Sequence, residues 1–128
     1  RRFLTSEWKL SPKSNRVGFR LDGPEWTFTD KATNKAPENG SDPSNTIDHG
    51  YPIGAINLCG QTPIILLHDT LTLGGFINPF TVPSAAFWKL GQSRPNENYE
   101  FELISVEEAQ ARKRSINGLC SEDSIEVV

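Results

Sequence analysis

Two short apolar runs separated by a tight turn constrain the fold of this chain most strongly. Residues 54–59 and residues 63–67 each have the length of one strand, and Gly60-Gln61-Thr62 between them has turn-forming composition. Strands joined this closely pair as an antiparallel hairpin. Because the rest of the chain also offers closely spaced extended segments, we expect a mainly β barrel or sandwich rather than a parallel α/β sheet.

Strict alternation of apolar and polar residues predicts a further strand over residues 16–21. One face carries Val17, Phe19 and Leu21, and the other carries Arg16, Gly18 and Arg20. This period of two is typical of a half-buried strand. Extended structure is also expected in residues 3–10, 26–29, 76–82 and 99–103, so the chain should contain six or seven strands.

Two short helices are expected in the C-terminal third of the chain. The first covers residues 85–90 and stops at Gly91. Ser105-x-x-Glu108 is a capping box, which starts a second helix that runs through Arg114.

Two segments have no clear pattern of helix or strand. Residues 30–46 have almost no apolar side chains and predict a long loop, partly disordered through Gly40. Residues 115–128 form a tail of uncertain order.

The composition argues against several classes of function. The chain has a net charge of −3 and no basic block, so nucleic acid is not an expected partner. No apolar run approaches the ~18–20 residues that cross a membrane. Cys59 and Cys120 lack metal-binding spacing, so we expect free thiols in a reducing, cytoplasmic compartment and no metal.

The length predicts one domain or a fragment of a larger one. The 128 residues begin at Arg1 and contain no methionine, which favours a truncated chain.

Polar side chains near strand ends and turns are the candidates for a ligand site. Arg16 and Arg20 share one strand face, where two guanidinium groups could bind a carboxylate or carbonate; a solvated strand face is the alternative. Further clusters are Asp48-His49 before Gly50, and Asp69 with Thr72 before a Gly74-Gly75 turn. Polar groups that converge at the mouth of a β-barrel commonly bind ligands. Signature motifs of hydrolases and nucleotide-binding proteins are absent from the sequence.

Four motifs follow one another along the chain: Ser14-Asn15-Arg16-Val17-Gly18-Phe19-Arg20-Leu21-Asp22-Gly23-Pro24, Pro43-Ser44-Asn45-x-Ile47-Asp48, Gly54-Ala55-Ile56-Asn57, and Pro63-Ile64-Ile65-Leu66-Leu67-x-Asp69-x-x-Thr72-x-Gly74-Gly75-Phe76. Together they resemble the carboxyltransferase domain of urea carboxylase, the biotin-dependent part of urea amidolyase. The second motif resembles the urea carboxylase branch in particular. The same module occurs in the bacterial 5-oxoprolinase C subunit and in the antagonist of a sporulation-kinase inhibitor.

The resemblance implies a cyclophilin-like β-barrel. It also implies that residues 1–114 are the C-terminal half of a carboxyltransferase module and that residues 115–128 are a tail. Such an enzyme is an ATP- and biotin-dependent ligase that moves the carboxyl group of carboxybiotin to urea and gives allophanate. The expected partners are the N-terminal half of the module and a biotin carboxyl carrier; biotin is carried on that other domain, and this fragment alone should be inactive.

The resemblance and the needs of the transfer assign roles to the matched residues. Arg16 and Arg20 are expected to stabilise negative charge on the biotin ureido oxygen. Asp48 and Asp69 would orient the urea amides, and biotin itself is a candidate base. The expected substrate- and biotin-binding set is Asn45, Thr72 and the backbone amides of Gly74 and Gly75.

Two departures from the family pattern bear on this interpretation. Thr70-Leu71 stands where urea carboxylases tend to show Gly-Pro. Asn57 stands where bacterial relatives often have Gln, which disfavours the 5-oxoprolinase branch. The open alternatives are a 5-oxoprolinase subunit and a non-catalytic module of the same fold that regulates a partner.

Overall fold

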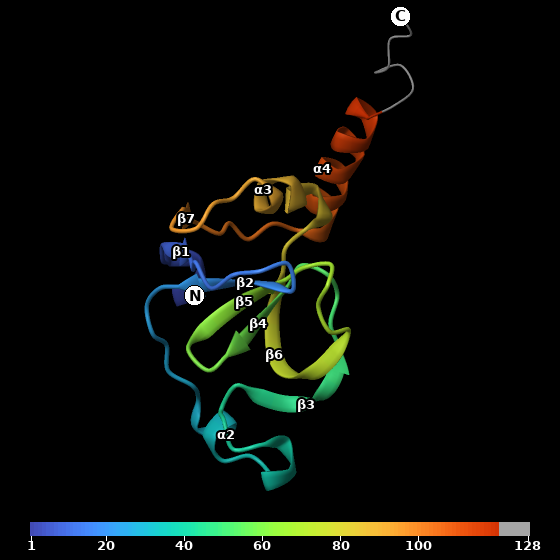
Figure 1. Ribbon diagram of the computed structural model, residues 1–128. Coiled ribbons are helices and arrows are strands. Elements are labelled where there is room, and N and C mark those ends of the chain that lie inside the picture. The colour runs from blue at the N-terminus through green and yellow to red at the C-terminus, as the bar shows by residue number, and fades with distance from the viewer. Residues whose placement is uncertain (121–128) are drawn as a thin grey trace, which may run out of the picture.

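The computed structural model describes residues 1–120, and its main feature is one antiparallel sheet of seven strands (Figure 1). The strands are β1 (Trp8–Leu10), β2 (Gly18–Asp22), β3 (Asn45–Gly50), β4 (Ala55–Cys59), β5 (Thr62–Leu66), β6 (Leu73–Thr81) and β7 (Asn98–Tyr99). The helices are α1 (Arg2–Thr5), α2 (Asp30–Thr33), α3 (Phe87–Gly91) and α4 (Val106–Leu119), with the 3-10 turns η1 (Pro37–Asn39) and η2 (Ser84–Ala86). The mainly β class is therefore confirmed.

The strands follow the order β3-β6-β4-β5-β2-β1-β7 across the sheet. Within residues 1–120, the edge strands β3 and β7 each pair on one side only, so the described sheet is open rather than closed into the expected barrel. In Figure 1, β3 and α2 lie at one end of the molecule, whereas β7, α3 and α4 lie at the other.

The predicted hairpin is present as β4 and β5, with Gly60 in its turn. Gly60 adopts a φ of 59°, a left-handed conformation that a glycine accepts without strain. The alternation predicted for the preceding strand is also present in β2, where Leu21 is buried and Arg20 is exposed. Val17, predicted to face inward, is 45% exposed because it lies just before β2 begins.

Other predicted strands are shorter or absent. Residues 3–10 contain the end of helix α1 before β1, residues 26–29 form no strand, and residues 99–103 contribute only Tyr99 to β7. The loop expected over residues 30–46 contains α2 and η1 in the segment expected to be partly disordered. Strand β3 was not predicted. It lies at the edge of the sheet and its Ile47 is 70% exposed, so it lacks the alternating buried face by which a strand is identified in sequence.

Both predicted C-terminal helices are present. The first consists of η2 and α3, which ends at Gly91. The second, α4, begins after Ser105, whose Oγ accepts a hydrogen bond from the amide of Glu108 at 3.1 Å, as the capping box predicts. Helix α4 continues past Arg114 to Leu119 and projects away from the sheet (Figure 1). Residues 121–128, which make up most of the predicted tail, lie outside the described residues.

The hydrophobic core joins the middle of the sheet to α3. Its buried members are Trp8, Leu10, Leu21, Ile56, Ile65 and Leu90. Phe3 of α1 extends this core, because its ring lies 5.1 Å from that of Trp8 and stacks on Phe80 at 5.2 Å. Since side chains alternate along a strand, Arg20, Asn57 and Ile64 belong to the opposite face of β2, β4 and β5.

Strand β6 shifts its register against β3. Asn45 pairs with Phe76, but His49 pairs with Gly74, so residues 46–48 lie opposite Gly75 alone. Such a bulge bends the strand and redirects its side chains.

A second register shift separates β6 from β4. The pairs on its two sides are Ile56 with Phe80, and Leu58 with Ile77. Residues 78–79 therefore lie opposite Asn57 alone. This bulge accommodates Pro79 inside the strand, because a bulged residue need not donate to the hydrogen-bond ladder.

Ser44 connects the loop before β3 to two other parts of the sheet. This fully buried side chain donates to Asp42 Oδ1 at 2.6 Å and accepts from the amide of Gly60 at 3.0 Å. Its carbonyl accepts from the amide of Ile77 at 3.0 Å. Ser44 thereby holds β3 beside the turn of the β4–β5 hairpin and the middle of β6.

Replacing Ser44 by alanine should lower the free energy of unfolding by about 1–3 kcal/mol, because the amide of Gly60 would lose its buried partner. Chemical denaturation monitored by tryptophan fluorescence measures this change. Ser41→Ala, at an exposed position of the same loop, is the matched control and should change the stability little. Equal effects of the two substitutions would contradict the role given to Ser44.

The same contacts predict a dependence of stability on pH. Hydrogen bonds from the side chain and then the amide of Ser44 lower the pKa of Asp42 below 3.8, against a small opposing effect of burial and with help from Lys35. A lowered pKa stabilises the folded state above the unfolded pKa, and this stabilisation is lost as the pH falls through the folded pKa. The stability advantage of the wild type over Asp42→Asn should therefore be constant near neutral pH and shrink below about pH 4. Urea denaturation at a series of pH values measures it, and a pH-independent difference would refute the assignment.

Candidate functional site

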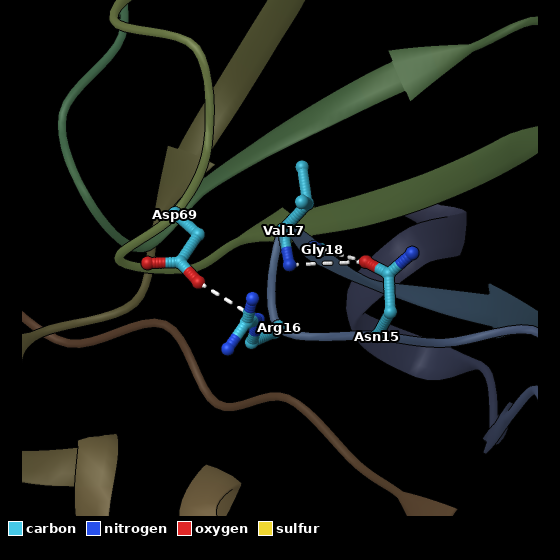
Figure 2. A network of polar contacts seen from close by, with 5 residues as sticks. All are labelled: Asn15, Arg16, Val17, Gly18 and Asp69. Atoms are coloured by element: carbon cyan, nitrogen blue, oxygen red, sulfur yellow. Dashed lines mark hydrogen bonds and ion pairs between the residues drawn. The ribbon is translucent and has the colours of Figure 1, made fainter.

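The structure brings Arg16 and Asp69 together as an ion pair at the surface (Figure 2). Arg16 Nε lies 3.0 Å from Asp69 Oδ2, and the two side chains are 90% and 52% exposed. The segment before β2 is held by Asn15, whose Oδ1 accepts from the amides of Val17 at 3.0 Å and Gly18 at 3.3 Å. This turn presents Arg16 toward the loop after β5, as Figure 2 shows.

The ion pair borders a small cavity of about 230 Å³. Its walls are largely apolar and come from β2, the end of β5 and α3: Phe19, Leu66, Leu67, Phe87 and Leu90. The Arg16 side chain is 90% exposed, so the terminal nitrogens of its guanidinium can be reached from solvent. They offer the parallel donors that suit a carboxylate or carbonate.

Arg20 lies in a different place from Arg16. It lines a second cavity of about 290 Å³, together with Asn57 and Gly74. Arg20 pairs with Ile64, and Ile64 pairs with Asn57, so the three residues form a row on one face of β2, β5 and β4. With neighbouring strands ~4.8 Å apart, the backbones of Arg20 and Asn57 stand roughly 10 Å from each other.

The second cavity lies between that face of the sheet and residues 70–76. Tyr51 forms part of its wall, and the Tyr51 hydroxyl accepts a hydrogen bond from the amide of Phe76 at 2.6 Å. A Cβ atom on Gly74 would stand 2.7 Å from the Tyr51 hydroxyl, so only glycine fits here. The amide of Tyr51 donates to the Thr72 carbonyl at 2.7 Å, which fixes the tyrosine against β6.

The predicted Gly74-Gly75 turn is wrong, because both glycines lie inside β6. The turn after β5 comes earlier, at His68 and Asp69. Gly75 is required for contact with the bulge of β3, since a Cβ atom there would stand 2.9 Å from Asp48 Oδ1 and from the Thr46 carbonyl. Asp48 is thus close to Gly75, but it lines neither of the two cavities.

The remaining predicted residues lie apart from these cavities. Asn45 pairs with Phe76 at the start of β3. The carbonyl of Thr72 accepts a hydrogen bond from the amide of Tyr51. His49 is a hydrogen-bonding histidine, with Nε2 at 3.1 Å from Asn78 Oδ1. The eight predicted site residues are therefore divided among the two cavities and the β3–β6 edge.

Asn57 is the residue that sequence patterns do not identify as part of a site. It is only 4% exposed, and its Oδ1 accepts no hydrogen bond within the described part of the chain. A polar residue inside the apolar run of residues 54–59 is the signal that could have singled it out.

A larger apolar cavity of about 460 Å³ lies elsewhere, beside α3 and β7. Its lining includes Phe3, Phe80, Tyr99 and Phe101, and none of the predicted site residues. Burial raises the pKa of Tyr99, and the nearby Glu97 adds to this effect. The cavity offers apolar surface rather than charged groups for chemistry.

Other features of the first 120 residues bear on the remaining predictions. Cys59 and Cys120 are free thiols, as expected. In this part of the chain, His, Cys, Asp and Glu form no cluster of three or more that could hold a metal ion. None of the helices found there combines the length and apolar character that crossing a membrane requires.

The chain forms a mainly β domain in which Arg16 and Arg20 each line a small cavity beside the sheet. Comparison with known proteins specifies the class: the family described as carboxyltransferase domain, subdomain A and B, matches residues 1–103. The chain belongs to this carboxyltransferase family.

Individual relatives agree with this assignment. The chain is 40% identical over 113 residues to a urea amidolyase of Saccharomyces cerevisiae, which covers 88% of this chain and 6% of that protein. It is 35% identical over 117 residues to a putative urea carboxylase of Emericella nidulans. This match covers 91% of this chain and 9% of that protein. The crystal structure of the Kluyveromyces lactis urea carboxylase superposes with a TM-score of 0.80 and 33% identity, over 99% of this chain and 11% of that one. The chain therefore spans only about a tenth or less of these relatives.

Loss of the Arg16–Asp69 pair should hardly change stability. Exposed ion pairs contribute about 0–1 kcal/mol, so Arg16→Ala and Asp69→Ala should each lower the free energy of unfolding by less than about 1 kcal/mol. The matched control is the exposed Arg112–Glu108 pair of α4. Chemical denaturation of the single and double variants gives both coupling energies. A coupling energy of several kcal/mol for Arg16 and Asp69 would mean that the pair serves the fold.

Proposed function

We propose that this chain forms part of the carboxyltransferase domain of a biotin-dependent urea carboxylase, in which the carboxyl group of carboxybiotin passes to urea and gives allophanate. The observation that carries the proposal is the match to the Kluyveromyces lactis urea carboxylase along 99% of the chain. The named relatives at 40% and 35% identity support the same branch of the family.

The complete protein would then be an ATP- and biotin-dependent ligase of the cytoplasm. Residues 1–114 would supply the C-terminal half of the carboxyltransferase module, within a cyclophilin-like barrel completed by the N-terminal half. A separate carrier domain would bring the carboxybiotin, and the fragment alone would be inactive. The relatives support such partners, because each is many times longer than the segment that matches this chain.

The transfer needs positive charge and hydrogen-bond donors where negative charge develops. Arg16 is suited to this need because its side chain is 90% exposed, while Asp69 Oδ2 lies 3.0 Å from its Nε. The pair would orient the guanidinium toward the carboxylate that leaves biotin. Arg20 would serve the neighbouring cavity.

The other predicted residues receive narrower roles. Asp69 would act as a positioning residue for Arg16, and Asp48 would orient a urea amide from the β3 edge if the missing half of the module brings the substrate there. Asn45, Thr72, Gly74 and Gly75 would shape the wall around Tyr51 and Asp48, as their contacts suggest. Biotin itself is the candidate for the base that accepts the urea proton.

A chimera tests this function. The matching segment of the Saccharomyces cerevisiae urea amidolyase would be replaced by this chain, and urea-dependent turnover of the purified chimera would be measured. The chimera should turn over urea, and Arg16→Ala should lower kcat by roughly 10²–10³-fold because a donor to the developing charge is lost. Asp69→Ala should lower kcat less, and Arg16→Lys should restore only part of the activity.

Arg112→Ala is the control, because it removes an arginine from another exposed ion pair, in α4. It should leave turnover unchanged. Full turnover by both Arg16→Ala and Asp69→Ala would overturn the site assignment. A folded chimera that carboxylates its biotin but never consumes urea would overturn the proposed function.

A further inference from the structure

One serine of helix α4 directly follows three basic residues. Arg112, Lys113 and Arg114 precede Ser115, and all four residues are exposed. The hydroxyl of a serine is a group that protein kinases phosphorylate. A kinase with acidic side chains beside its cleft attracts cations just ahead of the target hydroxyl, because the two charged surfaces are complementary. The charge pattern before Ser115 fits a kinase of this kind.

The segment that carries Ser115 packs little against the rest of the protein. No residue of α4 is buried, and within residues 114–119 only Ile116 is half-buried. The contacts of α4 lie near its start, where Val106 and Ala109 line a shallow cavity together with η2. Beyond this point the helix projects away from the sheet (Figure 1). Unwinding of the second half of α4 therefore exposes no part of the core.

The composition of the helix end also favours its opening. Residues 115–118, Ser-Ile-Asn-Gly, are weaker helix formers than alanine, and glycine is among the weakest. Helix α4 ends at Leu119, so Ser115 lies close to an end that can fray. A kinase must place the target hydroxyl in line with the γ-phosphate of ATP, which requires the surrounding segment to enter its cleft. A segment that unwinds from its end can meet this requirement.

Thr5 has a similar charge pattern in a different environment. It is exposed and follows Arg1 and Arg2 by four and three residues. Its helix α1 is held in place, however, because Phe3 packs against the hydrophobic core and Arg2 Nη1 donates to the Glu25 carbonyl at 2.7 Å. Opening of α1 would remove Phe3 from the core. Basic residues and freedom to unwind therefore occur together at Ser115 and not at Thr5.

We propose that Ser115 is a phosphorylation site for a protein kinase that selects basic residues ahead of its target. Ser115 Oγ attacks the γ-phosphorus of ATP, the bond from this phosphorus to the bridging oxygen breaks, and ADP leaves. The hydroxyl proton passes to the catalytic aspartate of the kinase. The site does not rest on the proposed carboxyl transfer, because Ser115 lies beyond residues 1–103 that match the carboxyltransferase family.

Phosphate incorporation into the purified 128-residue chain tests the proposal. The catalytic subunit of cyclic-AMP-dependent protein kinase, which selects arginines ahead of its target, is the probe and is supplied with Mg²⁺ and ATP. Mass spectrometry should locate the phosphate at Ser115. Ser115→Ala should abolish most of the incorporation. Thr5→Ala is the matched control, since it removes the other hydroxyl with two arginines ahead of it, and should leave incorporation unchanged.

Arg112→Gln tests recognition of the basic residues. It should lower kcat/KM of the kinase reaction several-fold. The substitution also removes the ion pair with Glu108, which loosens the helix, so a slower reaction reports lost recognition rather than lost access. Lys13→Gln, at an exposed position beside Ser14, is the control and should leave kcat/KM unchanged.

Gly118→Ala tests the need for unwinding. A Cβ atom at Gly118 meets no atom within 4 Å, so alanine fits and strengthens the helix. Phosphorylation should slow about fivefold, as the difference in helix propensity between glycine and alanine predicts. Gly91→Ala in α3, where a Cβ atom also meets nothing within 4 Å, is the control and should leave the rate unchanged.

Three results would overturn the proposal: no incorporation into the chain, full incorporation into Ser115→Ala, or phosphate found at Thr5 in place of Ser115. Equal rates for Gly118→Ala and the wild type would refute the part given to unwinding. None of these measurements involves urea turnover, so their outcome is separate from that of the chimera.

Discussion

The arrangement of polar groups depends on the way in which β6 pairs with two neighbours in succession. Its first half pairs with β3 and its second half with β4, and the register shifts on both sides. The first shift bends β3 over Gly75 and brings Asp48 against it; the second leaves Asn57 opposite a bulge. Because only the second half of β6 pairs with β4, residues 70–76 stand over the face that carries Arg20 and Asn57, and a cavity forms between them. Ser44 supports this arrangement by joining the loop before β3 to Gly60 and Ile77.

This geometry gives the two arginines of β2 and its preceding turn different surroundings. Arg16 is exposed and engaged by Asp69 through a single nitrogen, which suits a group that meets a charged ligand at the surface. Arg20 lines a cavity together with the buried Asn57 and with Tyr51, away from the Arg16–Asp69 pair. The predicted site residues are therefore divided among two cavities and the β3–β6 edge.

The sequence predicts the elements that have a buried apolar face and misses those that do not. The β4–β5 hairpin, the Leu21 side of β2 and the capped start of α4 all follow from local pattern, because burial and capping leave a signature within a few residues. Strand β3 has no such signature in the sequence, because it is an edge strand and its Ile47 is exposed. The pairing of Arg16 with Asp69 joins residues far apart in sequence, and neither the sequence pattern nor the resemblance predicted it. The Gly74-Gly75 pair was predicted as a turn because glycine is common in turns; here the absence of a side chain serves close packing against Tyr51 and Asp48. Asn57 could not be recognised from one sequence as unpaired, because that depends on the bulge in a strand about twenty residues away.

The central claim is that Arg16, held by Asp69, is the arginine on which the proposed carboxyl transfer depends. Urea-dependent turnover of the chimera with the Saccharomyces cerevisiae urea amidolyase tests it most directly. The account predicts a loss of kcat of roughly 10²–10³-fold for Arg16→Ala and no loss for Arg112→Ala. Full turnover by Arg16→Ala would contradict it.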